Sequence, residues 1–154
     1  MKNKTRKKIQ LCDIIENEIK DNSLRNGFPK SFDSHIKKLK VKKIINHEDF
    51  TDIPFVTIDG QDSKDFDDAV WSETKQGITN IMIAISDVSF FIEKNDPLDI
   101  EAKKRGNSFY FPDRVIPMFP NEISNDICSL IPNKERASVV TEIKIKNFKI
   151  ISFK

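Results

Sequence analysis

The sequence predicts an α+β protein in which residues 1–50 form a basic helical leader and residues 51–154 form a partial mixed β-sheet with helices. Two patterns predict this class. Apolar residues of the first part recur every three or four positions, the spacing of an amphipathic helix. After Asp52, short β-branched runs alternate with turn signals, which is typical of strands. The 154 residues, 38% hydrophobic and 32% charged, suit one domain with a lean core.

Two short helices are expected in the leader. The first, within residues 8–20, has an apolar stripe made of Leu11, Ile14, Ile15 and Ile19. Asn26-Gly27 is a stop signal after it. Pro29 is expected to open the second helix, whose stripe is Phe32, Ile36 and Leu39. We expect these stripes to dock on another part of the protein, because neither is large enough to form a core alone.

Five strands are expected after the leader, each a short apolar, β-branched run. They are placed at residues 54–58, from 69–71 onward, 79–85 continuing toward 88, 137–145 and 148–153. Residues 81–85 run without a polar break, so that strand is expected to be buried, after a turn at 75–77. The last strands are expected to leave an open sheet edge and exposed apolar surface, an aggregation liability.

A third helix is marked at both of its ends. Asp96 can cap its N-terminus, Pro97 suits its first position, and Gly106 fits the position after its last turn. Basic residues fill that last turn, where the helix dipole favours positive charge. A proline-punctuated loop over residues 108–120 and a short helix from Asn121 are expected to follow.

The charge of the chain is unevenly distributed. Residues 1–43 carry 13 Lys and Arg against 5 Asp and Glu, whereas residues 44–154 carry 13 against 19. The basic part could contact a polyanion, although a solvated lysine-rich helix surface is the plainer interpretation. The acidic remainder argues against simple electrostatic binding of nucleic acid, so metal ions or further segments would have to supply positive charge.

The cysteines and the N-terminus bear on the cellular compartment. Cys12 and Cys128 lie far apart and form no CxxC pair, which predicts neither a disulfide framework nor a zinc site. Cys128 is expected to be a small buried hydrophobe. Carboxylates such as Asp13 interrupt the apolar residues after the basic start, so neither a signal peptide nor a membrane span is predicted. A cytoplasmic location is the default expectation.

A run of acidic residues is the most informative feature of the chain. Five aspartates fall within ten residues: Asp59, Asp62, Asp65, Asp67 and Asp68. Such dense like charges are tolerated if they are solvated, if some are protonated, or if a cation lies among them. Mg²⁺ typically binds through a few carboxylates together with substrate phosphates. The run therefore predicts a magnesium site for phosphate chemistry, with a solvated acidic turn as the alternative.

Two other motifs place an aspartate in a comparable setting. A calcium loop starting at Asp65 would need an oxygen ligand and then a glycine where Ala69 and Val70 stand, so it is excluded. A phosphorylated aspartate at the end of a buried strand could be Asp59, with Gly60 allowing a sharp exit. That hypothesis leaves the neighbouring aspartates unexplained.

The region around the aspartates resembles a known family. Residues 52–70 resemble the signature of the ribonuclease II / ribonuclease R family, whose members are processive 3′→5′ exoribonucleases. Further stretches resemble the family in the same order, at residues 83–89, 98–108, 110–118 and 124–130. The resemblance implies that residues 51–154 are the N-terminal part of an RNB-type catalytic domain, and that the leader is the linker before it.

The resemblance also implies roles for individual residues. The family's four acidic active-site positions, which hold Mg²⁺, fall on Asp59, Asp65, Asp67 and Asp68. Asp62 falls on a variable position. Tyr110 falls on the aromatic residue that stacks on a base near the scissile phosphate, and stacking tolerates any base. Arg114 could face RNA phosphate, or it could form a salt bridge with Asp113 or another carboxylate.

The family function implied for the chain is Mg²⁺-dependent hydrolysis of single-stranded RNA from its 3′ end, with release of nucleoside 5′-monophosphates. The resemblance covers well under half of the catalytic domain, whose remainder supplies an arginine, a glutamate and much of the RNA channel. Losing one such preorganised contact commonly costs ~10²–10³ in rate. Three hypotheses therefore remain: a nuclease completed by a second polypeptide, an inactive remnant, and a non-catalytic RNA- or metal-binding fragment.

Overall fold

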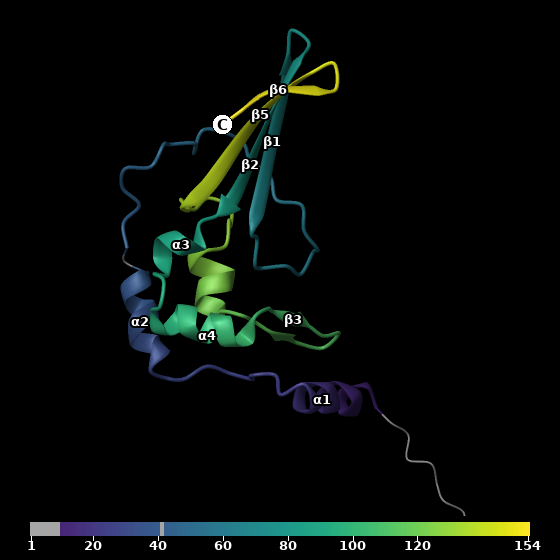
Figure 1. Ribbon diagram of the computed structural model, residues 1–154, viewed down its shortest axis with the longest axis vertical. Coiled ribbons are helices and arrows are strands. Elements are labelled where there is room, and N and C mark those ends of the chain that lie inside the picture. The colour runs from purple at the N-terminus through teal and green to yellow at the C-terminus, as the bar shows by residue number, and fades with distance from the viewer. Residues whose placement is uncertain (1–9, 41) are drawn as a thin grey trace, which may run out of the picture.

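The structure, a computed structural model, describes residues 10–40 and 42–154. Helices gather at one end of the molecule, and a β-sheet projects from them (Figure 1). The α+β class is thus confirmed. Residues 8 and 9 of the first expected helix lie outside the described residues, as does the basic start of the chain.

The two helices of the leader form, and both dock as expected. Helix α1 spans Leu11–Asp21 and buries Ile15 and Ile19, whereas α2 spans Phe32–Leu39 and buries its whole stripe. Helix α1 ends at Asp21, one residue beyond the expected range, where the Asn22 side chain donates a hydrogen bond to the Glu18 carbonyl and closes the last turn.

The start of α2 differs from the prediction. Pro29 does not open the helix, since a turn follows it and its carbonyl accepts from the Phe32 amide, where α2 begins.

The sheet has four strands in the order β1-β2-β5-β6. Their bounds are Asp68–Lys75 for β1, Ile78–Ser86 for β2, Ser138–Lys146 for β5 and Lys149–Phe153 for β6. All three pairings are antiparallel, so the expected mixed sheet is corrected to an antiparallel one. Two-residue turns at Gln76-Gly77 and Asn147-Phe148 explain the β1–β2 and β5–β6 pairings, because their positive φ angles close tight hairpins.

Two strand predictions need correction. Residues 54–58 form no strand. Val56 makes a single bridge to Val70 of β1, the other residues of the run have no strand partner, and Ile58 is exposed. The expected buried strand is β2, but only Met82 and Ala84 are buried in it. It also stops at Ser86 instead of continuing toward residue 88.

The region between β2 and β5 supplies the remaining helices. Asp87 caps α3 (Val88–Phe91), and Asp96 caps α4 (Pro97–Arg105) by accepting from the Leu98 and Asp99 amides. Gly106 has a φ of 75°, as expected after the last turn. The proline-punctuated loop contains a two-stranded ribbon of β3 (Phe109–Tyr110) and β4 (Val115–Ile116). The short helix after Asn121 is η1 (Ile123–Ile127), a π-helix.

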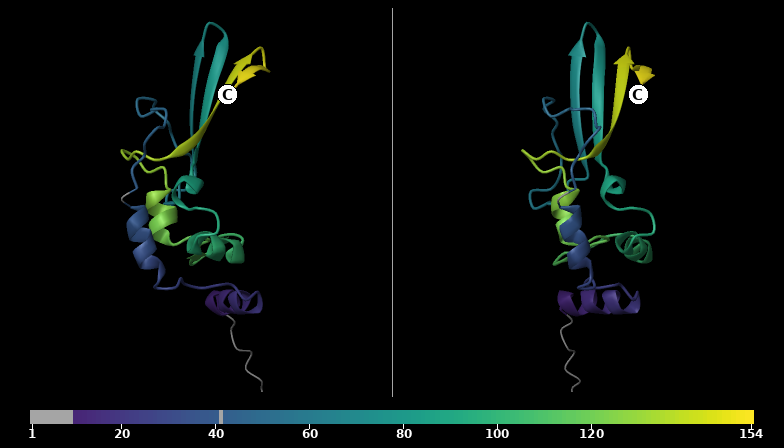
Figure 2. Two further views of the ribbon diagram at one scale, coloured as in Figure 1. Left: turned by 60° about the vertical axis from the view of Figure 1, so that its left-hand side comes forward. Right: turned by 90° about the vertical axis from the view of Figure 1, so that its left-hand side faces the viewer.

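Two hydrophobic clusters hold the helical end together. The larger contains α2 residues packed with Phe91, Leu98 and Ile123. The smaller joins Ile15 and Ile19 of α1 to Ile116 of β4. Neither cluster includes a residue of the four-stranded sheet, which extends beyond the helices in both views of Figure 2. In the described ranges no helix is long and apolar enough to cross a membrane.

Candidate functional site

The predicted acidic residues lie on the segment that leads into the sheet. Asp59 and Asp65 lie in the loop after Val56, Asp67 directly precedes β1, and Asp68 is its first residue. Asp59 therefore follows an exposed loop and not a buried strand, which corrects the expected setting. The charges of Asp59, Asp65 and Asp68 nevertheless act on Asp67 and raise the pKa of its carboxyl.

Ser129 anchors this segment from the far end of the sequence. Its side chain is fully buried, and its hydroxyl donates to the Lys64 carbonyl at 2.7 Å and accepts from the Phe66 amide at 3.0 Å. The Leu130 amide adds a bond to the Phe66 carbonyl at 2.9 Å. Both backbone groups on either side of Asp65 are thereby fixed, so Ser129 sets the course of the chain between Asp65 and Asp67.

Two further contacts hold the same region. The Ser86 amide donates to the Asp67 carbonyl at 2.9 Å, which ties the start of β1 to the end of β2. Arg136 donates from Nε to the Ser129 carbonyl at 3.0 Å and from Nη2 to Asp126 at 3.3 Å. Neither Ser129 nor Arg136 is among the site residues predicted from the sequence. The only signal for Ser129 was its place in the family-like stretch at residues 124–130.

The electrostatics of the cluster centre on Asp67. Desolvation by the surrounding protein raises the pKa of its carboxyl, and repulsion from Asp65, Asp68 and Asp59 raises it further. The folded protein thus holds Asp67 in an environment that disfavours its negative charge. A bound cation would relieve this repulsion, which is the physical link between the cluster and metal binding.

Tyr110 reaches the cluster from β3. Its hydroxyl donates to Oδ2 of Asp65 at 2.5 Å, while the residue stays 65% exposed. The hydrogen bond to Asp65 raises the pKa of the phenol to about 12, with smaller contributions from burial and from Asp67. Tyr110 is therefore a neutral donor at physiological pH, with its ring open to solvent. The structure places this predicted residue beside the predicted carboxylates.

Arg114 does not point at the acidic cluster. It donates to Asp113 at 2.8 Å and to Glu16 of α1 at 2.6 Å, which is the salt-bridge alternative considered from the sequence. These two carboxylates raise the pKa of the guanidinium. Arg114 therefore ties α1 to the β3–β4 ribbon in this conformation. A contact with RNA phosphate remains a prediction.

The donor set suits Mg²⁺ in its chemistry. Four carboxylates offer the oxygen ligands that hard divalent cations take, and the raised pKa of Asp67 shows that their charges already interact. In residues 10–40 and 42–154, however, no three His, Cys, Asp or Glu side chains are arranged to hold one ion together. A shared ion would therefore draw the carboxylates closer than they lie in this conformation.

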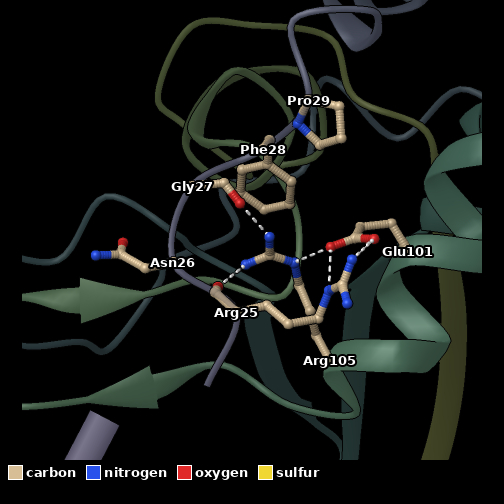
Figure 3. A pocket seen from close by; sticks show the side chains of 7 residues that line it. All are labelled: Arg25, Asn26, Gly27, Phe28, Pro29, Glu101 and Arg105. Atoms are coloured by element: carbon tan, nitrogen blue, oxygen red, sulfur yellow. Dashed lines mark hydrogen bonds and ion pairs between the residues drawn. The ribbon is translucent and has the colours of Figure 1, made fainter. Parts of the chain in front are cut away.

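A separate polar cluster, the Arg25 clamp, lies where the leader meets α4. Glu101 accepts from Arg25 at 2.7 and 2.9 Å and from Arg105 at 3.1 Å (Figure 3). Arg105 also donates to the carbonyls of Arg25 and Gly27, and its guanidinium lies 3.7 Å from the centre of the Phe28 ring. The three clamp residues also line an adjoining pocket of about 410 Å³, together with Asn26, Gly27, Phe28 and Pro29. The clamp ties the leader to α4.

Comparison with known proteins identifies the class to which this fold and this acidic segment belong. Residues 47–154 match the RNB domain, and the chain belongs to that family. The relatives are ribonuclease R proteins. The Escherichia coli (strain K12) protein is 48% identical over 100 residues, which are 64% of this chain and 12% of the relative. The protein of Buchnera aphidicola subsp. Acyrthosiphon pisum is 42% identical over 138 residues, 82% of this chain and 19% of the relative.

A solved structure shares the fold. Mycoplasma genitalium RNase R, in complex with ribose methylated single-stranded RNA, superposes with a TM-score of 0.86 at 34% identity. The match covers 94% of this chain and 23% of that one. The matched part is thus 12% to 23% of the length of these three proteins.

Proposed function

We propose that the chain carries the Mg²⁺-binding acidic segment of an RNB-type exoribonuclease that hydrolyses single-stranded RNA from its 3′ end and releases nucleoside 5′-monophosphates. One observation carries the proposal: burial and the charges of three neighbouring aspartates raise the pKa of Asp67, on a segment that Ser129 fixes by hydrogen bonds. The RNA-bound state of the structurally similar Mycoplasma genitalium RNase R supports RNA as the ligand class. Membership of the RNB family supports the reaction type.

The side chains of the site take distinct roles in this proposal. Asp59, Asp65, Asp67 and Asp68 would hold Mg²⁺, which when bound supplies an acidified water and a counter-charge for the leaving oxygen. Tyr110 offers an exposed ring on which a base can stack whatever its identity. Its hydroxyl holds Asp65 by a hydrogen bond and thereby orients that carboxylate. Arg114 would contact RNA phosphate only after release from Glu16 or Asp113.

The proposal extends to partner and compartment. Because the chain spans 12% of its Escherichia coli relative, we propose that turnover depends on polypeptide corresponding to the rest of the catalytic domain. The two free cysteines support a reducing, cytoplasmic location.

An RNA degradation assay tests the function. End-labelled single-stranded RNA is incubated with the chain, alone and mixed with the Escherichia coli ribonuclease R polypeptide that follows the matched region. We expect Mg²⁺-dependent shortening from the 3′ end in the mixture, lost in Asp67→Asn and kept in Asp62→Asn, the matched control from the same loop. Mg²⁺-dependent RNA binding without shortening in either sample would contradict the nuclease and favour a non-catalytic binding fragment.

A further inference from the structure

The buried Ser129 hydroxyl is delivered by an irregular turn at the end of η1. The Cys128 amide donates to the Ile123 carbonyl at 2.9 Å, five residues back, which is the hydrogen bond of a π-helix. A π-turn contains one more residue than an α-turn, so it changes the direction in which the following residues point. Such turns are rare, and where they occur they are often found at functional sites. We call residues 126–129 the Ser129 turn.

The Ser129 turn is connected to the acidic segment at two places. The Ser129 hydroxyl holds the backbone on either side of Asp65. The Cys128 carbonyl accepts from the Ser86 hydroxyl, and the Ser86 amide donates to the Asp67 carbonyl at 2.9 Å. A shift of the turn would therefore move the backbone beside both aspartates.

Arg136 bridges the two ends of the Ser129 turn. It donates from Nε to the Ser129 carbonyl at 3.0 Å and from Nη2 to Oδ1 of Asp126 at 3.3 Å. Its third nitrogen, Nη1, donates to the Glu135 carbonyl at 3.0 Å, and its side chain is only 16% exposed. Because the guanidinium is a rigid planar fork, these bonds fix Asp126 and Ser129 relative to each other.

The two ends of the turn have other partners besides Arg136. The Ser129 carbonyl also accepts from the Ile131 amide at 2.8 Å. The Asp126 side chain is half exposed and also pairs with Lys40 at 3.3 Å. Arg136 is therefore not needed to satisfy either group, and its distinct contribution is the alignment of the turn that carries Ser129.

We propose that Arg136 is a positioning residue for the acidic segment, because it fixes the Ser129 turn that places Asp65 and Asp67. Among the described residues its hydrogen bonds go to the turn and to Glu135, and to none of the four predicted ligands. Its effect on Mg²⁺ affinity rests on the proposed function. Its effect on the place of the segment rests on these contacts alone.

Hydrogen exchange in buffer without metal or RNA tests the placement. The Phe66 amide, which donates to Ser129, is compared with the Ala84 amide of the central strand β2. We expect Arg136→Gln to speed exchange of the Phe66 amide at least about tenfold relative to the Ala84 amide, because the acceptor of its hydrogen bond is no longer fixed. A role limited to global stability would speed both amides alike, and that result would overturn the proposal.

A calorimetric titration with Mg²⁺ tests the consequence for metal binding. We expect Arg136→Gln to weaken binding by about tenfold, as is usual when a residue that orients metal ligands from outside is lost. The direction of the change is informative, since removing a positive charge by itself strengthens the binding of a cation. Unchanged or tighter Mg²⁺ binding by the folded variant would overturn the proposal.

Two further variants separate placement from charge and from folding. Arg25→Gln removes another arginine with a bridging role, at the leader, and should leave both the exchange ratio and the Kd within about twofold. Arg136→Lys keeps the charge but has no fork to span Asp126 and Ser129, so it should behave as Arg136→Gln. Wild-type values in Arg136→Lys, or an equal effect of Arg25→Gln, would overturn the proposal.

The two measurements keep this inference separate from the proposed function. If the wild type binds no Mg²⁺, the proposed function fails and the exchange ratio alone decides the role of Arg136. If Mg²⁺ binds and the exchange ratio is the same in the wild type and Arg136→Gln, the proposed function stands and the positioning role fails. If Arg136→Gln does not fold, Arg136→Lys replaces it in both measurements, and the same results overturn the proposal.

Discussion

The sequence predicts the chemistry of the side chains in the acidic segment, but it does not predict the contacts that hold them. The density of aspartates alone indicates a cation site, and the structure shows that three of them act on Asp67. The anchoring by Ser129 could not be predicted, because its partners Lys64 and Phe66 lie more than sixty positions away and meet it only in the folded chain.

The raised pKa of Asp67 predicts a gain in stability when its charge is removed. The folded state holds the Asp67 proton more tightly than the unfolded state, whose pKa is near 3.8, so ionised Asp67 lowers stability as pH rises through the folded pKa. Without metal, Asp67→Asn should therefore have a higher thermal midpoint than the wild type at pH 7. The difference should vanish below about pH 3.8, where both states are protonated.

Thermal melts in metal-free buffer at the two pH values check this. Asp62→Asn is the control, since it removes a charge from the same loop outside the predicted set of ligands. A lower midpoint for Asp67→Asn than for the wild type at pH 7 would show that Asp67 is not under repulsion.

Loss of the Ser129 hydroxyl should destabilise the whole protein. Ser129→Ala leaves the Lys64 carbonyl and the Phe66 amide without their partner in a buried place, which costs about 1–3 kcal/mol in the free energy of unfolding. Urea unfolding of the variant measures it. Ser34→Ala, at an exposed serine that bonds only within its own turn, should change the value by no more than about 0.5 kcal/mol. If Ser129→Ala and Ser34→Ala lower the free energy of unfolding equally, Ser129 does not anchor the segment.

Helices were predicted better than strands because their signals are local. Asp96, Pro97 and Gly106 mark the ends of α4, and each signal lies within the helix or next to it. Residues 54–58 have the composition of a strand, but a strand also needs a partner along its length, and the chain offers only Val70. The partial exposure of β2 has the same origin, since the burial of a strand depends on the layer that covers it.

The Arg25 clamp predicts that Glu101 is needed for the leader to dock. The Arg105 side chain is almost fully buried, so Glu101→Gln leaves a buried guanidinium without its carboxylate, at a cost of about 3 kcal/mol. Hydrogen bonding from Arg25, then the charges of both arginines, lower the pKa of Glu101. The stabilisation is therefore present above the unfolded value of 4.5 and is lost as pH falls through the lower folded pKa.

Chemical denaturation of Glu101→Gln and the wild type from pH 7 down to pH 3 measures both effects. The difference in the free energy of unfolding between Glu101→Gln and the wild type should become smaller as the pH falls. Glu93→Gln, at an exposed glutamate just before α4, is the control and should stay within about 0.5 kcal/mol of the wild type at every pH. If this difference in the free energy of unfolding does not change with pH, the stability of the clamp does not depend on the Glu101 charge.

The two ends of the molecule differ in structure. Helices gather at one end, and the four-stranded sheet projects from it (Figure 1). The helical end contains both hydrophobic clusters and holds the leader, whereas the sheet begins at Asp68 and includes the exposed strand β6. The exposed apolar surface of the last strands was expected from the sequence, and β6 confirms it. The position of this apolar surface next to the acidic site was not expected from the sequence. The row from Asp68 through Ile85 to Val139 depends on the register of three strands.

The central claim is that Asp59, Asp65, Asp67 and Asp68 form a Mg²⁺ site, and thermal unfolding across a Mg²⁺ titration tests it most directly. Because a ligand of the folded state stabilises by mass action, the wild-type midpoint should rise by about 4 °C once Mg²⁺ is tenfold above its Kd. The rise should be absent in Asp67→Asn and kept in Asp62→Asn. A wild-type midpoint that does not move with Mg²⁺, or an equal rise in Asp67→Asn, would contradict the claim.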